Sequence, residues 1–420
     1  MTERLACSNP TCSRTILPTT AAATGGLCGP CRRTQVSDER AAFIQANRRT
    51  IDPYAGITDP VALILRMAEP RPYDPLTVVL APTSSLEDLY ATLTSVESAR
   101  LVDAGVHAFD QGNHDVAEEI MRCLVCWTSH SVDTLLDAFV AHQHYTPPMA
   151  FLRAGPSIRD LLLRRIAEPG APHNALLVAL AWIGDDRVVQ QFAAWRDHPP
   201  SWAGDLFIPP EDYALEAGWE LMIGPHRHDL VAPIGYALVP RTGPTDSPVT
   251  VVRPTEEPCG WCGKPLVALF TLDCTDPALA WLAVNTAVVV VRTCPTCTCY
   301  GVIYSAADAT HHPGWHPANQ RPTVLPDDPV WPLPANQLEL SAQPRSPMYA
   351  ANWLLPISFS QVGGHPTWID DAWYPHCPTC TRRMPFLAQL SVPDIDSGEG
   401  IFYTFLCPTC LIAATGYQQT

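Results

Sequence analysis

Twelve of the sixteen cysteines occur as six closely spaced pairs, and such pairs are typical of metal sites. Five pairs are Cys-x-x-Cys, and four residues separate Cys7 from Cys12. A tight turn presents two thiolates to one Zn²⁺ at about 2.3 Å, and two such turns complete a tetrahedron. The sequence therefore predicts three zinc sites, whose ligands are Cys7, Cys12, Cys28 and Cys31; Cys259, Cys262, Cys294 and Cys297; and Cys377, Cys380, Cys407 and Cys410.

Four cysteine ligands leave no open coordination position, so we expect these zinc ions to be structural rather than catalytic. Loop entropy favours closure of each pair with its neighbour in sequence, although exchange of pairs between the two C-terminal sets stays open. Residues 1–35 are too few to form a stable core without a cross-link or a bound metal ion. Zinc binding contributes roughly 10–16 kcal/mol in comparable modules, which is enough to fold this segment.

The other four cysteines are Cys123 and Cys126, which form a further Cys-x-x-Cys pair, and the leftover Cys274 and Cys299. Cys123 and Cys126 lie in a helical stretch, on one face with His130. We interpret them as small buried side chains, because the sequence around them does not show the strand followed by a helix N-terminus that lowers the pKa of a redox cysteine. A redox or metal role is the alternative. Cys274 and Cys299 are interpreted as core residues or neighbours of the metal sites, and the role of all four stays open.

Four regions are predicted to position these residues. A zinc-ribbon-like module spans residues 1–35, and an α-helical repeat domain spans residues 36–230, where apolar residues recur at helical spacing. Residues 175–183 and 187–195, joined by Gly184-Asp185-Asp186, resemble a HEAT-type helical hairpin. Residues 231–258 contain six prolines and are predicted to form a linker.

Residues 259–420 are predicted to hold two related β zinc ribbons. Each reads as a cysteine pair, an apolar strand, a loop, a second strand and a second cysteine pair. The two copies align with one two-residue insertion, which favours an internal duplication. The fold class expected for the chain is therefore α+β with several domains.

The sequence Gly363-Gly364-His365-Pro366-Thr367-Trp368 lies between the two ribbons. Two glycines before a proline favour a sharp turn that requires positive φ. Trp368 then anchors either the core or a partner protein. We predict a partner-binding face at Gly363, Gly364, Pro366 and Trp368.

Composition and motifs exclude several classes of function. The formal net charge is −16, which argues against nucleic-acid binding as the main task and favours a basic protein partner. The sequence contains no phosphate-binding loop, nucleophile elbow or zinc-protease motif, so we expect neither an enzyme nor a small-molecule substrate. It shows neither a signal peptide nor an apolar run long enough to span a bilayer, so we expect a cytoplasmic protein.

Residues 358–368, 384–390 and 400–405 together resemble the YwqG-like family of bacterial proteins. Their order beside a Cys-x-x-Cys pair is also similar to the C-terminal part of the programmed cell death protein 2 family. The resemblance covers about 60 residues. It implies protein binding rather than catalysis, since YwqG-like domains have been proposed as immunity proteins to toxins and the eukaryotic relatives escort a ribosomal protein.

The sequence thus predicts a non-enzymatic zinc protein that binds a basic partner protein as an adaptor, chaperone or immunity protein. The alternative is a thiol-based redox or zinc-responsive protein that uses Cys123 and Cys126 or a labile four-cysteine site. Partner identity and oligomeric state do not follow from the sequence.

Overall fold

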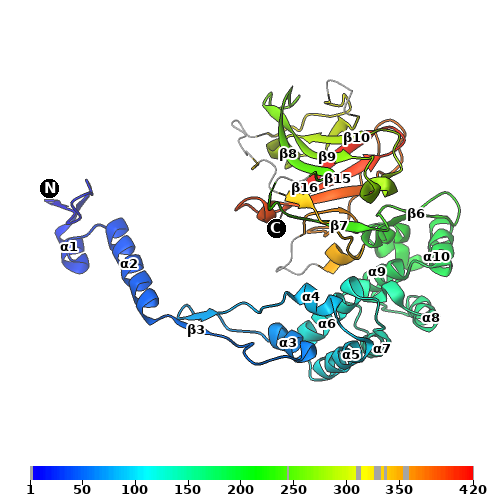
Figure 1. Cartoon of the computed structure of the whole chain (residues 1–420), viewed down its shortest axis with the longest axis horizontal. Helices are drawn as coiled ribbons and strands as arrows, with labels where there is room; N and C mark the ends of the chain where they lie inside the picture. The colour runs from blue at the N-terminus through cyan, green and yellow to red at the C-terminus, as the bar shows by residue number, and fades with distance from the viewer. Residues whose placement is uncertain are drawn as a thin grey trace. The chain divides into compact units, whose positions relative to one another are not determined.

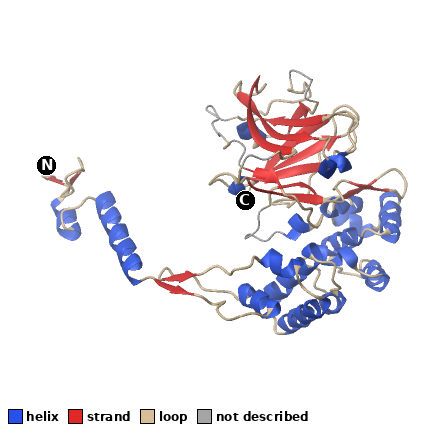
Figure 2. Ribbon diagram, in the orientation of Figure 1, coloured by secondary structure: helices blue, strands red, loops and turns tan. Residues whose placement is uncertain are grey.

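The computed structural model describes residues 3–243, 246–308, 314–325, 333–334, 338–352 and 359–419 (Figure 1). Ser358, the first residue of the segment that resembles YwqG-like proteins, lies outside these ranges. The chain divides into two compact units, residues 1–89 and 90–420. Helices and sheets are both abundant, which confirms the predicted α+β class (Figure 2). In the described ranges, no helix combines the length and the apolarity that crossing a bilayer requires.

The first unit contains short strands and three helices before the unit boundary. Its elements are β1 (Leu5–Ala6), β2 (Thr15–Ile16), α1 (Pro18–Thr24), α2 (Gly29–Asn47), β3 (Arg49–Ile51), α3 (Pro60–Ala68) and β4 (Thr77–Val79), and α4 (Leu86–Ala91) crosses the boundary. Pro30 suits the first turn of α2, where its missing N–H has no partner to lose. The predicted boundary at residue 35 therefore falls inside a helix.

Helices fill the first part of the second unit, at the segments where the apolar spacing predicts them. They are α5 (Ser95–Asp110), α6 (His114–Trp127), α7 (Asp133–Ala141), α8 (Pro156–Arg165), α9 (His173–Ile183) and α10 (Asp186–Asp197), with 3₁₀ turns η1 (Pro148–Arg153), η2 (Ser201–Asp205) and η3 (Pro210–Ala217). Thr94 and Glu97 form a reciprocal capping box that starts α5. The bulky side chains that face inward, such as Phe139 and Phe192, are fully buried.

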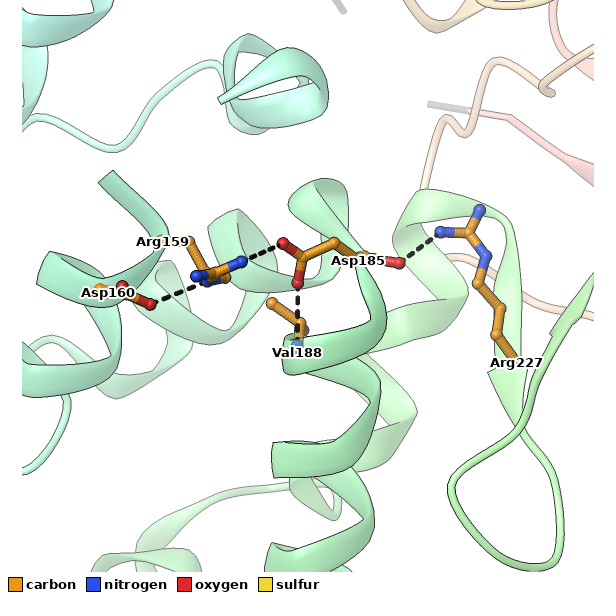
Figure 3. A network of polar contacts seen from close by, with 6 residues as sticks. Arg159, Asp160, Asp185, Val188 and Arg227 are labelled. Carbon is orange, nitrogen blue, oxygen red and sulfur yellow. Dashed lines mark hydrogen bonds and ion pairs between the residues drawn. The ribbon is translucent and has the colours of Figure 1, made fainter. Parts of the chain in front are cut away.

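A tight turn joins α9 to α10, as the sequence predicts. Gly184 adopts φ 53° at the end of α9, and the Asp185 carboxylate accepts the Val188 N–H at 3.0 Å to cap α10. Arg159 of α8 donates to the same carboxylate at 2.6 Å, and Arg227 donates to the Gly184 carbonyl at 2.9 Å (Figure 3). Two arginines distant in sequence, Arg159 and Arg227, therefore fix this turn.

The rest of the second unit is built on antiparallel sheets. One sheet has the order β11 (Ile303–Ala306), β16 (Ile412–Gln418), β15 (Ile401–Cys407), β14 (Phe386–Ser391), β13 (Gln361–Gly363), β7 (Gly235–Pro240), β12 (Leu338–Leu340). A second has the order β10 (Val288–Thr293), β9 (Pro265–Asp273), β8 (Val249–Pro258), and β5 (Trp219–Leu221) pairs with β6 (Arg227–Asp229). Short helical turns punctuate them, namely η4 (Pro277–Leu282), α11 (Pro295–Thr298), η5 (Tyr349–Asn352) and η6 (Val392–Asp394).

Both faces of β15 are covered, and its seven residues are all buried. Phe402 and Leu406 face a core shared with β8, β9 and β10. Tyr403 and Phe405 point to the opposite face, where Trp368 and other aromatic side chains pack. A continuous apolar strand is the pattern expected of a strand covered on both sides.

Residues 231–258 are not a linker, contrary to the sequence prediction. They contain β7, which pairs with β13 and β12, and β8, which among the described strands pairs with β9 alone. β8 is therefore an edge strand, and an edge strand tolerates prolines such as Pro254 and Pro258 because one side needs no ladder hydrogen bonds. The prediction was wrong because prolines in an edge strand and prolines in a linker give the same sequence pattern.

The two C-terminal cysteine sets occupy similar places. In each, a cysteine pair precedes a strand, and a hairpin leads to the second pair and then to a third strand. The two third strands, β11 and β16, pair with one another over four residue positions beginning at Ile303 and Thr415. This shared order is what an internal duplication would leave, and the duplication itself stays a prediction.

Candidate metal centres

The structure gathers the twelve predicted cysteines into three groups, each made of neighbouring pairs. Within each group all four sulfurs lie within 4.8 Å of one another. One pair of sulfurs in each group is 3.7 Å apart, between Cys12 and Cys28, Cys262 and Cys294, and Cys380 and Cys407. Tetrahedral sulfurs bound at about 2.3 Å would be about 3.8 Å apart, whereas a disulfide needs about 2.05 Å. Each group could therefore hold a metal ion.

The first group is built from turns and little else. The Cys7 N–H donates to the Arg14 carbonyl at 2.9 Å, which closes the β1–β2 hairpin, and Cys28 caps the start of α2. The Cys28 N–H donates to the Cys7 sulfur at 3.2 Å, and the Asn9 amide donates to Cys31 at 3.4 Å. In the described structure, the buried residues of this cluster are Cys7, Cys28 and one further residue, Ile16.

The second group lies where β9 begins and β10 ends. Trp261 and Trp315 pack edge to face beside it with centroids 5.7 Å apart, and Cys259, Cys294 and Cys297 are buried. The Trp261 N–H donates to the Cys259 sulfur at 3.4 Å. These contacts exclude water from most of the cluster.

The third group joins the loop before β14 to the turn between β15 and β16. Cys377 and Cys407 are buried in an aromatic core with Tyr374 and Phe405. Here a guanidinium and an N–H from Arg382 lie beside the Cys380 thiol and lower its pKa to about 6.

Three of the turns share one backbone feature. The residue after the second cysteine has positive φ, 75° at Gly263, 61° at Thr381 and 50° at Leu411. In each case its N–H donates to the carbonyl of the first cysteine, at 2.8–2.9 Å. Residues other than glycine rarely adopt this conformation, and Thr381 and Leu411 adopt it where their N–H groups close the turns that hold the cysteine pairs. Threonine at 381 and leucine at 411 give no sign of positive φ in the sequence.

The thiols in each group influence one another. The Cys28 N–H lowers the pKa of Cys7 to about 7, and hydrogen bonding from Cys294 lowers the pKa of Cys259 to about 5. The hydrogen bond to Cys28 raises the pKa of Cys31 to about 12, and that to Cys259 raises the pKa of Cys294. Four thiolates so close together repel, so full deprotonation requires a cation among them.

The remaining cysteines do not join these groups. Cys123 and Cys126 are fully buried in α6, and burial raises the pKa of both, that of Cys126 to about 12. The Asn352 amide donates to Cys123 at 3.5 Å, which links α6 to η5. Cys274 is half-buried and Cys299 is exposed. A low-pKa thiol that could act in redox chemistry is therefore found within the four-cysteine groups and not at Cys123 or Cys126.

The Gly-Gly-His-Pro element is an internal joint, and the predicted partner face is corrected. Gly363, Gly364 and Pro366 are buried. A side chain on Gly363 would come within 2.4 Å of the Ile234 carbonyl, and both glycines have positive φ. Trp368 is half-buried and stacks on Tyr403 with centroids 4.9 Å apart, so it anchors the core.

His365 is the residue of this element that sequence reasoning overlooked. Its two ring nitrogens face the carbonyls of Pro366 at 2.8 Å and Glu216 at 2.9 Å, and its ring packs against Trp182 of α9. Burial lowers the pKa of His365 to about 4. The histidine thereby joins the helical region to the sheet. Its position between Gly364 and Pro366 was the one feature of the sequence that could have marked it as a structural residue.

A small apolar hollow lies beside β14 and η4. Its volume is about 260 Å³, and it is lined by residues including Val231, Trp281, Leu282, Phe386 and Leu406. None of its lining residues is an acid, a base or a nucleophile. The hollow therefore offers no catalytic group.

Comparison with known proteins places this architecture in a family. The chain is 38% identical over 429 residues to the uncharacterized protein YpfL of Salmonella typhimurium (strain LT2), and the match covers the whole of both chains. The chain belongs to the YpfL family. The shared length indicates that both units and all three cysteine groups fall within the family's extent. No family model matches the chain, and no solved structure matches it.

Proposed function

We propose that this YpfL-family chain is a non-enzymatic zinc protein of the cytoplasm that binds a basic protein partner. The observation that carries the proposal is a pair of apolar loop tips in the second unit. Phe207 is 99% exposed and Ile223 is 95% exposed, with Ile208 and Met222 beside them also exposed. Large apolar side chains that are almost fully exposed at anchored loop tips are candidates for protein contact.

Both loops are rooted on consecutive residues of α10. Trp195 packs edge to face on Trp202 of η2, with centroids 5.4 Å apart, and η2 leads directly to Phe207. Arg196 donates to the Met222 carbonyl at 2.7 Å, and Arg227 fixes the other side of the same β5–β6 hairpin to Gly184. Anchored loops lose little entropy when they bind, which favours recognition.

Charge indicates what kind of partner suits this surface. The first 89 residues carry nine arginines and nine carboxylates, so the formal charge of −16 belongs to residues 90–420. An acidic unit with exposed apolar tips complements a basic protein that offers an apolar pocket. The resemblance of residues 358–368, 384–390 and 400–405 to YwqG-like proteins and to programmed cell death protein 2, which stays a prediction from the sequence, implies binding of this kind, as an immunity protein or an escort.

The metal proposed for all three groups is zinc, held structurally in ribbon-like turns. The sulfur spacing suits its bond length, and four thiolates leave it no open position for substrate. The helical region, with its HEAT-like hairpin α9–α10, then serves as a rigid platform for the two loops.

The test uses a double variant, Phe207→Ser with Ile223→Ser, in the zinc-loaded chain. After a partner has been captured from the host, its Kd for the double variant is expected to rise at least tenfold. The matched control is Val96→Ser with Val324→Ser, two side chains of the same unit that are 69% and 68% exposed. Equal weakening by both variants, or by neither, would exclude the loop tips as the contact.

A second candidate is a zinc-responsive thiol switch at the first group, where Cys12 and Cys31 are half-buried and Ile16 is the one further buried residue of the described cluster. Mild peroxide would then release one zinc ion per chain and oxidise thiols in residues 7–31 before any others. Release from all three groups at the same rate, or from none, would exclude it.

A further inference from the structure

The acidic charge of the chain conceals a basic segment at its start. Residues 1–49 contain three carboxylates, Glu3, Asp38 and Glu39, against seven arginines, so their formal charge is +4. The other residues together carry −20. A divalent ion with four thiolates adds −2 and leaves the segment positive. The arginines are Arg4, Arg14, Arg32, Arg33, Arg40, Arg48 and Arg49.

Helix α2 gathers three of these arginines on one face. At 100° per residue, Arg33 and Arg40 lie within about 20° of one another, and Arg32, Val36 and Phe43 flank them. The same arginines, with Val36 and Ser37, line one shallow hollow. The helix therefore has one arginine face, defined as Arg32, Arg33, Val36, Arg40 and Phe43.

The far side of α2 carries Cys31 and Asp38, about 150° or more from the centre of the arginine face. Glu39 lies about 20° from Arg32, at the edge of that face, and its carboxylate accepts the Gln35 amide at 2.8 Å. Arg33 and Arg40 lie about 100–120° from Glu39, so the positive potential of the face is greatest at these two arginines.

The arginine face is open to solvent. None of the nineteen residues of α2 is buried, and Val36 and Phe43 are 47% and 59% exposed. In the described part of the chain, neither Arg33 nor Arg40 forms an ion pair, and Arg32 donates only to Gln35, at 3.1 Å. A nineteen-residue helix with no packed side is marginal alone, and the cysteine group at its first turn secures only that end.

We propose that the arginine face of α2 binds the phosphate backbone of single-stranded nucleic acid. Guanidinium groups bind phosphate oxygens in pairs of hydrogen bonds, and unpaired guanidinium groups on one exposed face suit that ligand. The exposed ring of Phe43 on the same face provides a stacking surface for a base. An acidic protein would also complement the charge, and competition by polyglutamate distinguishes it from nucleic acid.

The experiment measures fluorescence anisotropy of labelled 20-nucleotide single-stranded RNA, single-stranded DNA and duplex DNA with the full zinc-loaded chain at several salt concentrations. For the single strands, log K against log[salt] is expected to fall with a slope of about −2, since each phosphate contact contributes about −0.7. Arg33→Gln with Arg40→Gln should reduce the slope to about −0.7. Arg66→Gln with Arg71→Gln removes the same charge from the same unit outside the face and should leave it unchanged.

Phe43→Ala separates stacking from charge. It should weaken single-strand binding about tenfold without changing the salt slope, and leave duplex binding unaltered. The proposal is overturned if the chain retains no nucleic acid at low salt, if both arginine pairs change the slope equally, or if polyglutamate competes as well per charge as the oligonucleotide. The last result would indicate an acidic protein ligand instead. Phe207→Ser with Ile223→Ser should not alter this binding, so the two proposals fail independently.

Discussion

The first and third cysteine groups arrange four sulfurs in similar ways but lie in different surroundings. Around the first, Ile16 is the one further buried apolar residue of its cluster in the described structure. Around the third, Tyr374, Met384, Phe386, Tyr403 and Phe405 form an aromatic core on one face of β15. Since a small module without a core depends on a cross-link or a bound metal, we expect a metal ion to fold the first region and to add little to the stability of the third.

Removing the metal should expose this difference most strongly. Chelation under reducing conditions is expected to unfold residues 3–28, because the binding free energy of about 10–16 kcal/mol is also their folding free energy. The interior of β14 and β15 should stay protected, because it is buried by side chains and paired on both edges. Hydrogen exchange followed by mass spectrometry measures both regions in one sample.

Cys28→Ser and Cys380→Ser form the matched pair for that experiment. The first should abolish protection throughout residues 3–28, whereas the second should affect only residues near the knuckles that contain Cys380 and Cys407. Persistent protection of residues 3–28 without metal would break the comparison.

Phe405→Ala tests the packing side of the same contrast. Phe405 is fully buried and contacts Trp368, Trp373, Tyr374 and Phe386. Truncation should lower the free energy of unfolding of the second unit by about 3–5 kcal/mol. The control is Phe43→Ala, since the exposed Phe43 ring should contribute less than about 0.5 kcal/mol to stability. Denaturant titration gives both values, and similar losses would contradict the assignment of the cores.

How much of this could be read from the sequence depended on the range of the interactions. The twelve ligands follow from local spacing, and helices α5 to α10 follow from apolar periodicity, because each signal lies within a few residues. The burial of Gly363 and Gly364 could not be predicted, since it depends on Ile234 and Pro347. His365 likewise contacts Glu216, which lies 149 residues away.

Edge strands were the other source of error. Proline at residues 254 and 258 signals a loop unless one knows that β8 has a neighbour on one side only. That information resides in the sheet order and not in residues 231–258 themselves.

The pH dependence of stability should locate the joint between the helices and the sheet. Burial lowers the pKa of His365 to about 4 from its usual 6.5, so the folded state prefers the neutral ring. Its contribution to stability is complete above pH 6.5 and is lost as pH falls towards 4, by about 3 kcal/mol. Urea unfolding of the second unit between pH 7 and 4 measures the loss.

His365→Gln is the control for this titration, because glutamine keeps a donor but does not gain a proton. Subtracting its pH curve from that of the natural chain removes the effect of thiol protonation at the clusters. A difference that stays constant with pH would mean that His365 titrates normally and that the joint is open to water.

The smallest predicted effect compares the second and third groups at one backbone position. Gly263 and Thr381 occupy equivalent places with φ 75° and 61°, but only glycine adopts this conformation without strain. Thr381→Gly should therefore stabilise the loaded third group by up to about 1 kcal/mol, and Gly263→Ala should destabilise the second by about 1 kcal/mol. Competition for zinc with a chromophoric chelator reports each change. Effects of the same sign in both variants would show that surrounding packing, and not the ligand turn, determines the backbone there. Opposite signs would show that the turn itself carries the strain, in the third group as in the second.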